Sequence, residues 1–276
     1  MKKHVLVTGG SGFVGRQVLD YFLTKDVYLT VIIRDGKQSL FVNNPAVQNI
    51  ITTTDLFAET SEWWASVMKG IDTVVHVAWY AEPGLYLQSS KNLDCLQGTL
   101  CMAKGAIQAG VRRFVGVGTC FEYDLSFGML STETPLKPLT PYAGAKAAAY
   151  IALSNELPAR GVEFIWCRLF YLYGKGEDAR RLVPYLREKF AAGELADLTS
   201  GNQIRDFIDV SEAGRLIGAV ALSEVQGAVN ICSGIPITIK QLAENIADEY
   251  GRRDLLNFGA RSENLIDPPC VVGLKN

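Results

Sequence analysis

The stretch VLVTGGSGFVG, residues 5–15, decides the fold of this chain. A short apolar run ends in Thr-Gly-Gly, and a segment with helical spacing follows from residue 13 to residue 24. Three glycines spaced three apart mark the turn, where a phosphate approaching the backbone leaves no room for side chains. Free N–H groups at the helix start attract a pyrophosphate, although a tight packing turn would look similar. We expect these loop residues to bind a dinucleotide: Gly9, Ser11, Gly12, Phe13, Val14 and Gly15.

Beyond this loop, short apolar runs alternate with longer segments of helical period. Most of the runs lack polar alternation, which is typical of strands buried on both faces. We expect strands in HVLVTG (4–9), YLTVIIR (28–34), VQNII (47–51), DTVVHVA (72–78), RRFVGVGT (112–119), VEFIWCRLF (162–170) and GAVNIC (227–232). Helices are expected at about 13–24, 86–109, 142–158 and 211–223. This alternation predicts an α/β fold, a Rossmann-type doubly wound parallel sheet.

The pattern changes after about residue 170, where loops rich in glycine, proline and arginine join shorter helical pieces. We expect residues 1–170 to form the dinucleotide-binding Rossmann domain, with a return segment at about 206–235. Residues from about 171–205 and 236–276 are expected to form a small C-terminal substrate-binding lobe.

Composition excludes several functional classes. The 276 residues are 48% apolar and 20% charged with a net charge of −2, which leaves no electrostatic footprint for nucleic acid. Six irregularly spaced cysteines without a CxxC pair, and two histidines, predict reduced thiols and no metal site. The N-terminal apolar run is too short for a signal-peptide core or a membrane span. We therefore expect a cytoplasmic protein with no membrane or nucleic-acid partner.

The stretch VIIRDG, residues 31–36, bears on the choice of cofactor. An acidic residue about 20 positions after the glycine loop binds a free ribose, whereas an arginine accepts a 2′-phosphate. Arg34 favours NADP(H), and Asp35 keeps NAD(H) open. Both residues are also common in solvated turns. We expect NADP, or else NAD, as the cofactor.

A second informative stretch is PYAGAKAAAY, residues 141–150, whose alanines favour a helix. Tyr142 and Lys146 are four residues apart, a spacing that places both side chains on one helical face. A nearby ammonium lowers the pKa of a phenol from about 10, so the pair can move a proton. An ordinary solvated helix face has the same spacing, and only the context separates the two interpretations.

Together these motifs resemble the extended short-chain dehydrogenase/reductase family, the NAD(P)-dependent epimerases, dehydratases and reductases of nucleotide sugars. The resemblance runs to about residue 235: TGGSGFVG is similar to TGxxGxxG, FVGVGT to the strand with the catalytic Ser or Thr, and RDFIDV to RDFxxV. It implies that Thr119, Tyr142 and Lys146 are catalytic. Lys146 would lower the phenol pKa and hold the nicotinamide ribose. Tyr142 would exchange a proton with a sugar oxygen to which Thr119 hydrogen-bonds.

The resemblance also implies further contacts to cofactor and substrate. The implied cofactor residues outside the glycine loop are Arg34, Asp35, Asp55, Leu56, Val77, Ala78 and Lys146. The implied substrate residues are Trp79, Cys120, Arg205 and Arg261, the two arginines as phosphate contacts. Trp79 either faces the sugar or packs under a loop. In relatives the helices equivalent to 86–109 and 142–158 form a dimer interface, so we expect a homodimer.

Departures from the family narrow the reaction. Sugar 4,6-dehydratases need an Asp-Glu pair directly after the catalytic Thr, where this chain has Cys120 and Phe121. Reductases that also epimerise C3 and C5 use a cysteine one position later and a distant histidine, but no histidine follows His76. We expect an NADP(H)-dependent reductase of a nucleotide-linked 4-keto sugar, often a 6-deoxy sugar. An NAD-dependent nucleotide-sugar C4 epimerase and a non-catalytic dinucleotide-sensing protein remain as alternatives.

Overall fold

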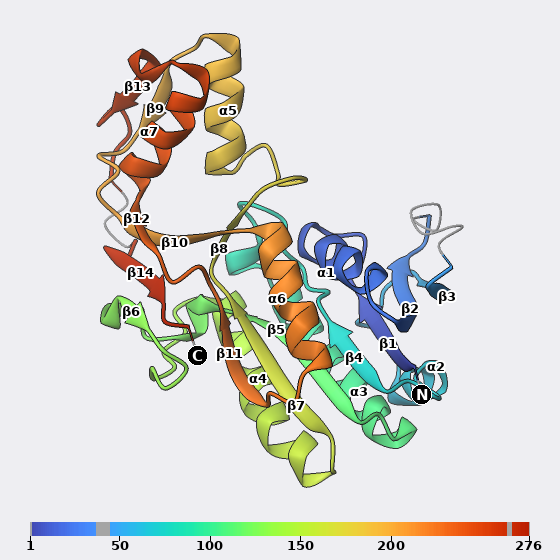
Figure 1. Ribbon diagram of the computed structural model, residues 1–276. Helices are drawn as coiled ribbons and strands as arrows, with labels where there is room; N and C mark the ends of the chain where they lie inside the picture. The colour runs from blue at the N-terminus through green and yellow to red at the C-terminus, as the bar shows by residue number, and fades with distance from the viewer. Residues whose placement is uncertain (1, 37–44, 264–266, 276) are drawn as a thin grey trace.

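A seven-stranded sheet forms the centre of the computed structural model, which describes residues 2–36, 45–263 and 267–275 (Figure 1). All its strand pairs are parallel, and the strand order is β11-β7-β5-β4-β1-β2-β3. The strands are β1 (Lys3–Thr8), β2 (Val27–Arg34), β3 (Val47–Thr53), β4 (Thr73–His76), β5 (Arg113–Thr119), β7 (Glu163–Leu169) and β11 (Gly227–Ile231). Each coincides with one of the seven runs predicted as strands, and the predicted doubly wound parallel sheet is confirmed.

Helices cover both faces of the sheet because alternate residues of each strand point to opposite layers. In β1, Val5 and Val7 belong to one apolar core and Leu6 belongs to the other. The first core includes α1 (Phe13–Leu23) and α6 (Val210–Leu222), and the second includes α2 (Ser61–Val67), α3 (Lys91–Ala109) and α4 (Pro141–Ala159). Figure 1 shows α1 in blue beside α6 in orange. They approach closely because Gly218 has no side chain: a Cβ there would lie 2.2 Å from the Tyr21 ring.

Local sequence explains where the helix that carries Tyr142 begins. Thr140 is its N-cap, and the Thr140 hydroxyl accepts a hydrogen bond from the Ala143 N–H at 3.2 Å. Pro141 occupies the first turn, where its missing N–H is harmless. Tyr142 therefore lies in the first turn of α4. The other long helix, α3, begins later than predicted because residues 86–88 form a separate 3₁₀ turn, η2 (Tyr86–Gln88).

The C-terminal elements form a small lobe at one end of the molecule (Figure 1). Its core lies between α5 (Leu182–Ala192) and α7 (Ile239–Tyr250), beside the paired strands β9 (Ala196–Leu198) and β13 (Leu256–Phe258). A mixed sheet joins lobe and body through β6 (Met129–Leu130), β8 (Tyr171–Tyr173), β10 (Ile204–Asp209), β12 (Pro236–Thr238) and β14 (Cys270–Gly273). The return segment expected at about 206–235 thus begins in this smaller sheet, within β10, and enters the central sheet only at β11.

Three further features bear on function. No helix within residues 2–36, 45–263 and 267–275 is long and apolar enough to cross a membrane. In that same part of the chain, no group of three or more His, Cys, Asp or Glu side chains could hold a metal ion. All six cysteines are free thiols.

Candidate active site

The predicted cofactor residues follow the carboxyl ends of four neighbouring strands. The glycine loop follows β1, the Arg34–Asp35 pair ends β2, Asp55 and Leu56 follow β3, and Val77 and Ala78 follow β4. Because neighbouring parallel strands end at the same edge, the fold gathers these residues along one side of the sheet. β1 lies between β2 and β4, so the chain winds outward in both directions from it. Ligands of doubly wound sheets bind at such a switch point.

The glycine loop leaves the amino end of α1 open to an anion. Gly12 is the N-cap, and no side chain of the described residues caps this helix. The loop is closed by its own backbone, with the Gly12 N–H donating to the Gly9 carbonyl oxygen at 2.9 Å. A Cβ on Gly15 would lie 2.1 Å from that same oxygen, and Gly9 has a φ of +71°. Gly9 and Gly15 thus make room for protein backbone, and the first-turn N–H groups fit a pyrophosphate.

Arg34 and Asp35 are both exposed where β2 ends. Within the described ranges, neither side chain makes a hydrogen bond or an ion pair. Asp35 is tied to the neighbouring strand only through its backbone N–H, which donates to the Thr53 carbonyl oxygen at 3.3 Å. The guanidinium of Arg34 is therefore exposed and unpaired among the described residues.

The fold brings the predicted catalytic hydroxyl groups together. Thr119 ends β5, and its side chain lies close enough to Tyr142 on α4 to lower the pKa of the phenol. The Tyr142 ring stands edge-on to the Tyr86 ring, with centroids 4.8 Å apart. Burial raises the pKa of Tyr142, and Tyr86 and Glu122 add to that increase. The phenol is therefore held protonated, which is the state that can donate a proton to a carbonyl oxygen.

The lowering of the Tyr142 pKa by Lys146 stays a prediction, since burial is the largest influence on that pKa and raises it. The Lys146 Nζ donates to the Val117 carbonyl oxygen at 2.5 Å and lies 3.7 Å from the centroid of the Trp79 ring. Burial lowers the pKa of Lys146 to about 7, and the negative charge of Glu122 opposes that shift.

A hydrogen bond from the edge of the Trp79 indole holds the ring in place against Lys146. Its Nε1 donates to the Asn92 Oδ1 at 2.9 Å. The Asn92 amide in turn donates to the carbonyl oxygens of Tyr86 and Ser89, at 2.7 and 2.9 Å. The sequence left open whether Trp79 faces the sugar or packs under a loop. In the structure one face of the indole covers the lysine ammonium, and a contact to substrate stays a prediction.

His76 lies in a buried network at the end of β4. Its Nδ1 is 2.8 Å from the Thr8 hydroxyl, and its Nε2 is 2.9 Å from the Thr99 hydroxyl. Thr99 donates its proton to the Cys95 carbonyl oxygen, so it accepts from the Nε2–H, and Nδ1 accepts from Thr8. Thr8 also accepts from the Ala78 N–H at 3.3 Å. Burial lowers the His76 pKa to about 3, so the imidazole stays neutral and positions the strand end.

The predicted substrate residues do not form one cluster as the predicted catalytic residues do. Cys120 is only 2% exposed and belongs to an apolar core cluster, which argues against direct contact with a substrate. Arg205 is buried, and its Nη2 lies 2.6 Å from the Asp267 Oδ2. Arg261 is exposed in the small lobe, with its guanidinium 4.8 Å from the Tyr185 ring centroid. Among the residues that the structure describes, no contact joins the two arginines.

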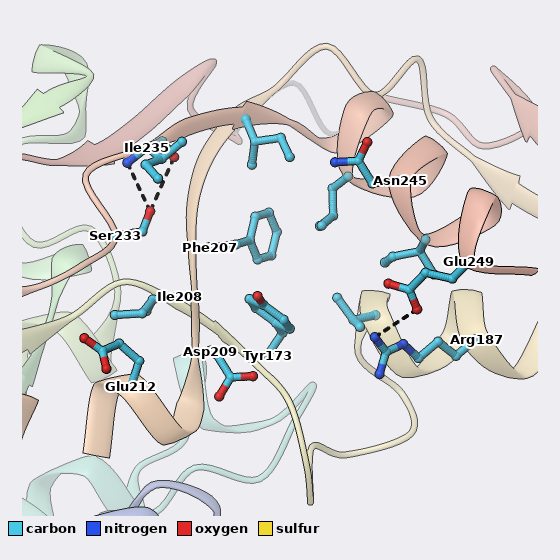
Figure 2. A pocket seen from close by; sticks show the side chains of 14 residues that line it. Tyr173, Arg187, Phe207, Ile208, Asp209, Glu212, Ser233, Ile235, Asn245 and Glu249 are labelled. Atoms are coloured by element: carbon cyan, nitrogen blue, oxygen red, sulfur yellow. Dashed lines mark hydrogen bonds and ion pairs between the residues drawn. The ribbon is translucent and has the colours of Figure 1, made fainter. Parts of the chain in front are cut away.

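A cavity of about 510 Å³ lies between the small lobe and the body (Figure 2). Figure 2 shows the rings of Phe207 and Tyr173 at its centre and the Arg187–Glu249 ion pair, 3.3 Å long, at its rim. Its lining, as far as the described residues go, includes no predicted site residue. This cavity is therefore separate from the catalytic group.

Sequence reasoning assigned no role to the buried ion pair next to Thr119. The Glu122 carboxylate accepts a hydrogen bond from the Thr119 N–H at 2.8 Å and pairs with the Arg168 Nε at 2.7 Å. The spacing Thr-x-x-Glu is the signature of a capping box, which this turn forms. The contact between Glu122 and Thr119 could therefore have been predicted from the sequence. Arg168 is 46 residues further along the chain, and no local signal connects it to Glu122.

Known proteins share this architecture. Residues 5–232 match the model of the NAD dependent epimerase/dehydratase family. Over 276 residues the chain is 22% identical to dTDP-6-deoxy-L-talose 4-dehydrogenase (NAD(+)) of Aggregatibacter actinomycetemcomitans, covering 99% of this chain and 100% of that protein. The fold is similar to UDP-N-acetylglucosamine 4-epimerase from Methanobrevibacter ruminantium M1 in complex with UDP-N-acetylmuramic acid, with a TM-score of 0.85, 24% identity, and coverage of 100% of this chain and 90% of that chain.

The fold is also similar to the UDP-glucose 4-epimerase of Thermus thermophilus in complex with NAD, with a TM-score of 0.81 and 20% identity. That similarity covers 99% of this chain and 90% of the epimerase chain. The family match covers most of the chain, which confirms the resemblance noted in the sequence. This protein is an enzyme of the extended short-chain dehydrogenase/reductase type, and it belongs to the NAD dependent epimerase/dehydratase family.

Proposed function

We propose that this enzyme reduces the 4-keto group of a nucleotide-linked sugar, often a 6-deoxy sugar, with an exchangeable nicotinamide dinucleotide. The observation that carries the proposal is the make-up of the catalytic group. The Thr119 side chain acts on the Tyr142 phenol, and burial raises the pKa of the second phenol beside it, Tyr86. Glu122 is paired with Arg168, and Cys120 is a buried thiol whose pKa is raised by burial. Such a site suits proton transfer at one oxygen atom.

Each side chain then has a definite task. Tyr142, held protonated, donates its proton to the carbonyl oxygen, and the Thr119 hydroxyl holds that oxygen in place. Lys146 uses one N–H on Val117 and has two left, with which it would hold the nicotinamide ribose. The bound nicotinamide would supply the hydride. Positioned proton transfer of this kind contributes about 10² to 10⁴ in rate.

Other chemistries of the family need groups that this site lacks. A 4,6-dehydratase would need carboxyl groups at Cys120 and Phe121. His76 cannot serve as a base for C3 or C5, because both ring nitrogens are occupied by threonine hydroxyls. The similarity to a 4-dehydrogenase over its whole length supports a reaction confined to C4.

A C4 epimerase would use the same three side chains, and the similarity to two 4-epimerase structures supports that alternative to the same degree. A purely sensing protein would have no need of Thr119, Tyr142 and Lys146 together.

The choice of dinucleotide is a separate part of the proposal. The family is NAD-dependent, and Asp35 fits a free ribose hydroxyl. The exposed guanidinium of Arg34 supports NADP(H), because it can pair with a 2′-phosphate. We also infer a homodimer through α3 and α4, where Leu93 and Ile151 are 68% and 54% exposed. A monomeric mass by light scattering would contradict the dimer.

Cofactor content and turnover test the function directly. The purified protein is analysed for bound dinucleotide and then titrated with NADPH and NADH, before assays with nucleotide-linked 4-keto sugars. A reductase binds the dinucleotide exchangeably and consumes one reduced dinucleotide for each product. Tightly retained NAD with inversion at C4 and no net consumption would establish the epimerase instead. Binding of the dinucleotide with no turnover of any nucleotide sugar would favour the sensing protein.

A further inference from the structure

The carboxylate of Glu122 is fully buried, and groups from three residues donate hydrogen bonds to it. The Thr119 N–H donates at 2.8 Å, the Arg168 Nε at 2.7 Å, and the Trp166 indole N–H reaches both oxygens at 3.0 Å. These donors fix the orientation of the carboxylate and favour its charged form, against burial, which raises the Glu122 pKa. The backbone of Thr119, at the end of β5, is therefore anchored by a side chain that substrate and solvent do not reach.

This anchor extends to the C-terminal segment of the chain. The Arg168 Nη1 donates to the Tyr123 hydroxyl at 3.0 Å, and that hydroxyl donates to the Asn230 Oδ1 at 2.7 Å. The Asn230 amide then donates to the carbonyl oxygens of Leu130 and Leu274, at 2.9 and 3.0 Å. One buried chain of hydrogen bonds thus connects the catalytic strand end to the last residues described.

Glu122 also acts on the second charged group of the site. The Lys146 ammonium and the Glu122 carboxylate lie against the same indole: the Lys146 Nζ is 5.8 Å from the centroid of the Trp166 ring, and the Trp166 Nε1 donates to both Glu122 oxygens. The titratable groups around the ammonium come from three elements: Glu122 on the turn after β5, Cys95 on α3 and His76 on β4. His76 is neutral, and burial raises the pKa of the Cys95 thiol. Burial lowers the pKa of Lys146 to about 7, and Glu122 is the strongest of the groups that raise it. The carboxylate therefore favours the charged lysine.

Stability alone does not account for this ion pair. A fully buried pair is often no more stabilising than apolar side chains of similar volume. A second Arg–Glu pair, Arg113–Glu163, joins the amino ends of β5 and β7, with 2.7 Å between the Arg113 Nη2 and the Glu163 Oε2. Glu163 is 25% exposed and far along the strand from Thr119, whereas Glu122 is fully buried and in contact with it.

We propose that Glu122 is a positioning residue of this active site: it fixes the backbone of Thr119 so that the hydroxyl meets Tyr142, and it supplies the buried negative charge that the Lys146 ammonium faces. The part that concerns Thr119 rests on the proposed function. The part that concerns Lys146 can be tested without any sugar substrate.

The first test compares Glu122→Gln with the matched variant Glu163→Gln. The dissociation constant of NADH is measured against pH, because the charged Lys146 would hold the ribose and the neutral one would not. In the wild type, affinity falls as pH rises through the Lys146 titration. Glu122→Gln should move that midpoint down by about 1 pH unit or more. Glu163→Gln should leave it in place.

Three results would overturn the inference: an unchanged midpoint in folded Glu122→Gln, an equal shift in Glu163→Gln, or a wild-type affinity that does not depend on pH. Glu122→Gln leaves Arg168 unpaired, which can prevent folding. In that event the double variant Glu122→Gln/Arg168→Met, which leaves no unpaired charge, should show the same downward shift of the midpoint. An unchanged midpoint in the double variant would contradict the proposed role of Glu122.

Turnover gives the second readout. Misplacement of Thr119 in Glu122→Gln should reduce kcat by about 10- to 100-fold with little change in KM, while Glu163→Gln keeps the wild-type kcat. A kcat that falls equally in both variants would reduce Glu122 to an ordinary structural residue. If the wild type turns over no nucleotide sugar, the proposed function fails, and the pH dependence of NADH binding still decides the role of Glu122.

Discussion

Lys146 and Trp79 make the closest cation–aromatic contact of the described chain, with the ammonium nitrogen 3.7 Å from the indole centroid. The lysine is 3% exposed, so little water competes with the ring. Desolvated contacts of this kind contribute about 2 kcal/mol. The indole ring therefore stabilises the charged form of the buried lysine and determines the direction in which its free N–H groups point.

Replacing Trp79 should accordingly weaken dinucleotide binding. We expect Trp79→Leu to reduce NADH affinity by about 3- to 30-fold, because the lysine loses its aromatic face. Trp79→Phe should retain most of the affinity. Both variants lose the indole hydrogen bond to Asn92, so their difference isolates the ring face. Equal dissociation constants for the two variants, measured by NADH fluorescence, would show that the contact is incidental.

Tyr142→Phe tests the proton donor. The variant keeps the ring against Tyr86, so the fold and the binding of dinucleotide should be preserved. Turnover should fall by about 10² to 10⁴ because the proton transfer is lost. Tyr86→Phe is the matched control, since it also removes one phenol oxygen from the same aromatic pair. Comparable kcat values for the two variants would reject Tyr142 as the acid.

The buried lysine should also make stability depend on pH. Its folded-state pKa of about 7 lies below the 10.5 of an ordinary lysine, so the unfolded chain binds more protons between those values. The free energy of unfolding contributed by this group therefore rises with pH. Urea unfolding between about pH 7 and about pH 9 should show that rise in the wild type and a smaller one in Lys146→Met. Parallel curves for the two proteins would contradict the lowered pKa.

The charges of Arg34 and Asp35 lead to opposite predictions about which cofactor is preferred. Arg34→Ala should weaken NADPH binding by about 10-fold or more and change NADH binding little, since only the former has a 2′-phosphate. Asp35→Ala should weaken NADH binding more than NADPH binding. Calorimetric titration of both variants with both cofactors provides the comparison. Equal losses of the two cofactors in Arg34→Ala would reject the phosphate role.

Arg205 is expected to bind the substrate diphosphate, yet in the structure it is paired with Asp267. If the phosphate replaces that carboxylate, Asp267→Asn should free the arginine and lower KM by up to about 5-fold, the value of a partly exposed ion pair. Arg205→Met should raise KM. Thermal melting of both variants serves as the control for folding. A KM unaffected by either change would make the pair purely structural.

The local patterns of this sequence were sufficient for the central fold. Seven apolar runs became the seven strands of the parallel sheet, because strand propensity and burial on both faces are readable from neighbouring residues. The glycine loop opens a helix without a side-chain cap, as its spacing predicts. Short elements of the second sheet, such as β6 and β14, carried no such signal, since each gains its pairing from a partner far away in the chain.

The catalytic side chains also divide into features that local sequence patterns predict and features that depend on partners far away in the chain. Thr119 and Tyr142 could be named from motifs, and the capping-box spacing of Glu122 was visible in the sequence. By itself, the sequence determined the doubly wound sheet, the dinucleotide loop and the residue types of the active site. Only the tertiary structure decided that Lys146 turns to Trp79 and that Arg205 is paired with Asp267, because such partners come from separate elements and are selected by packing.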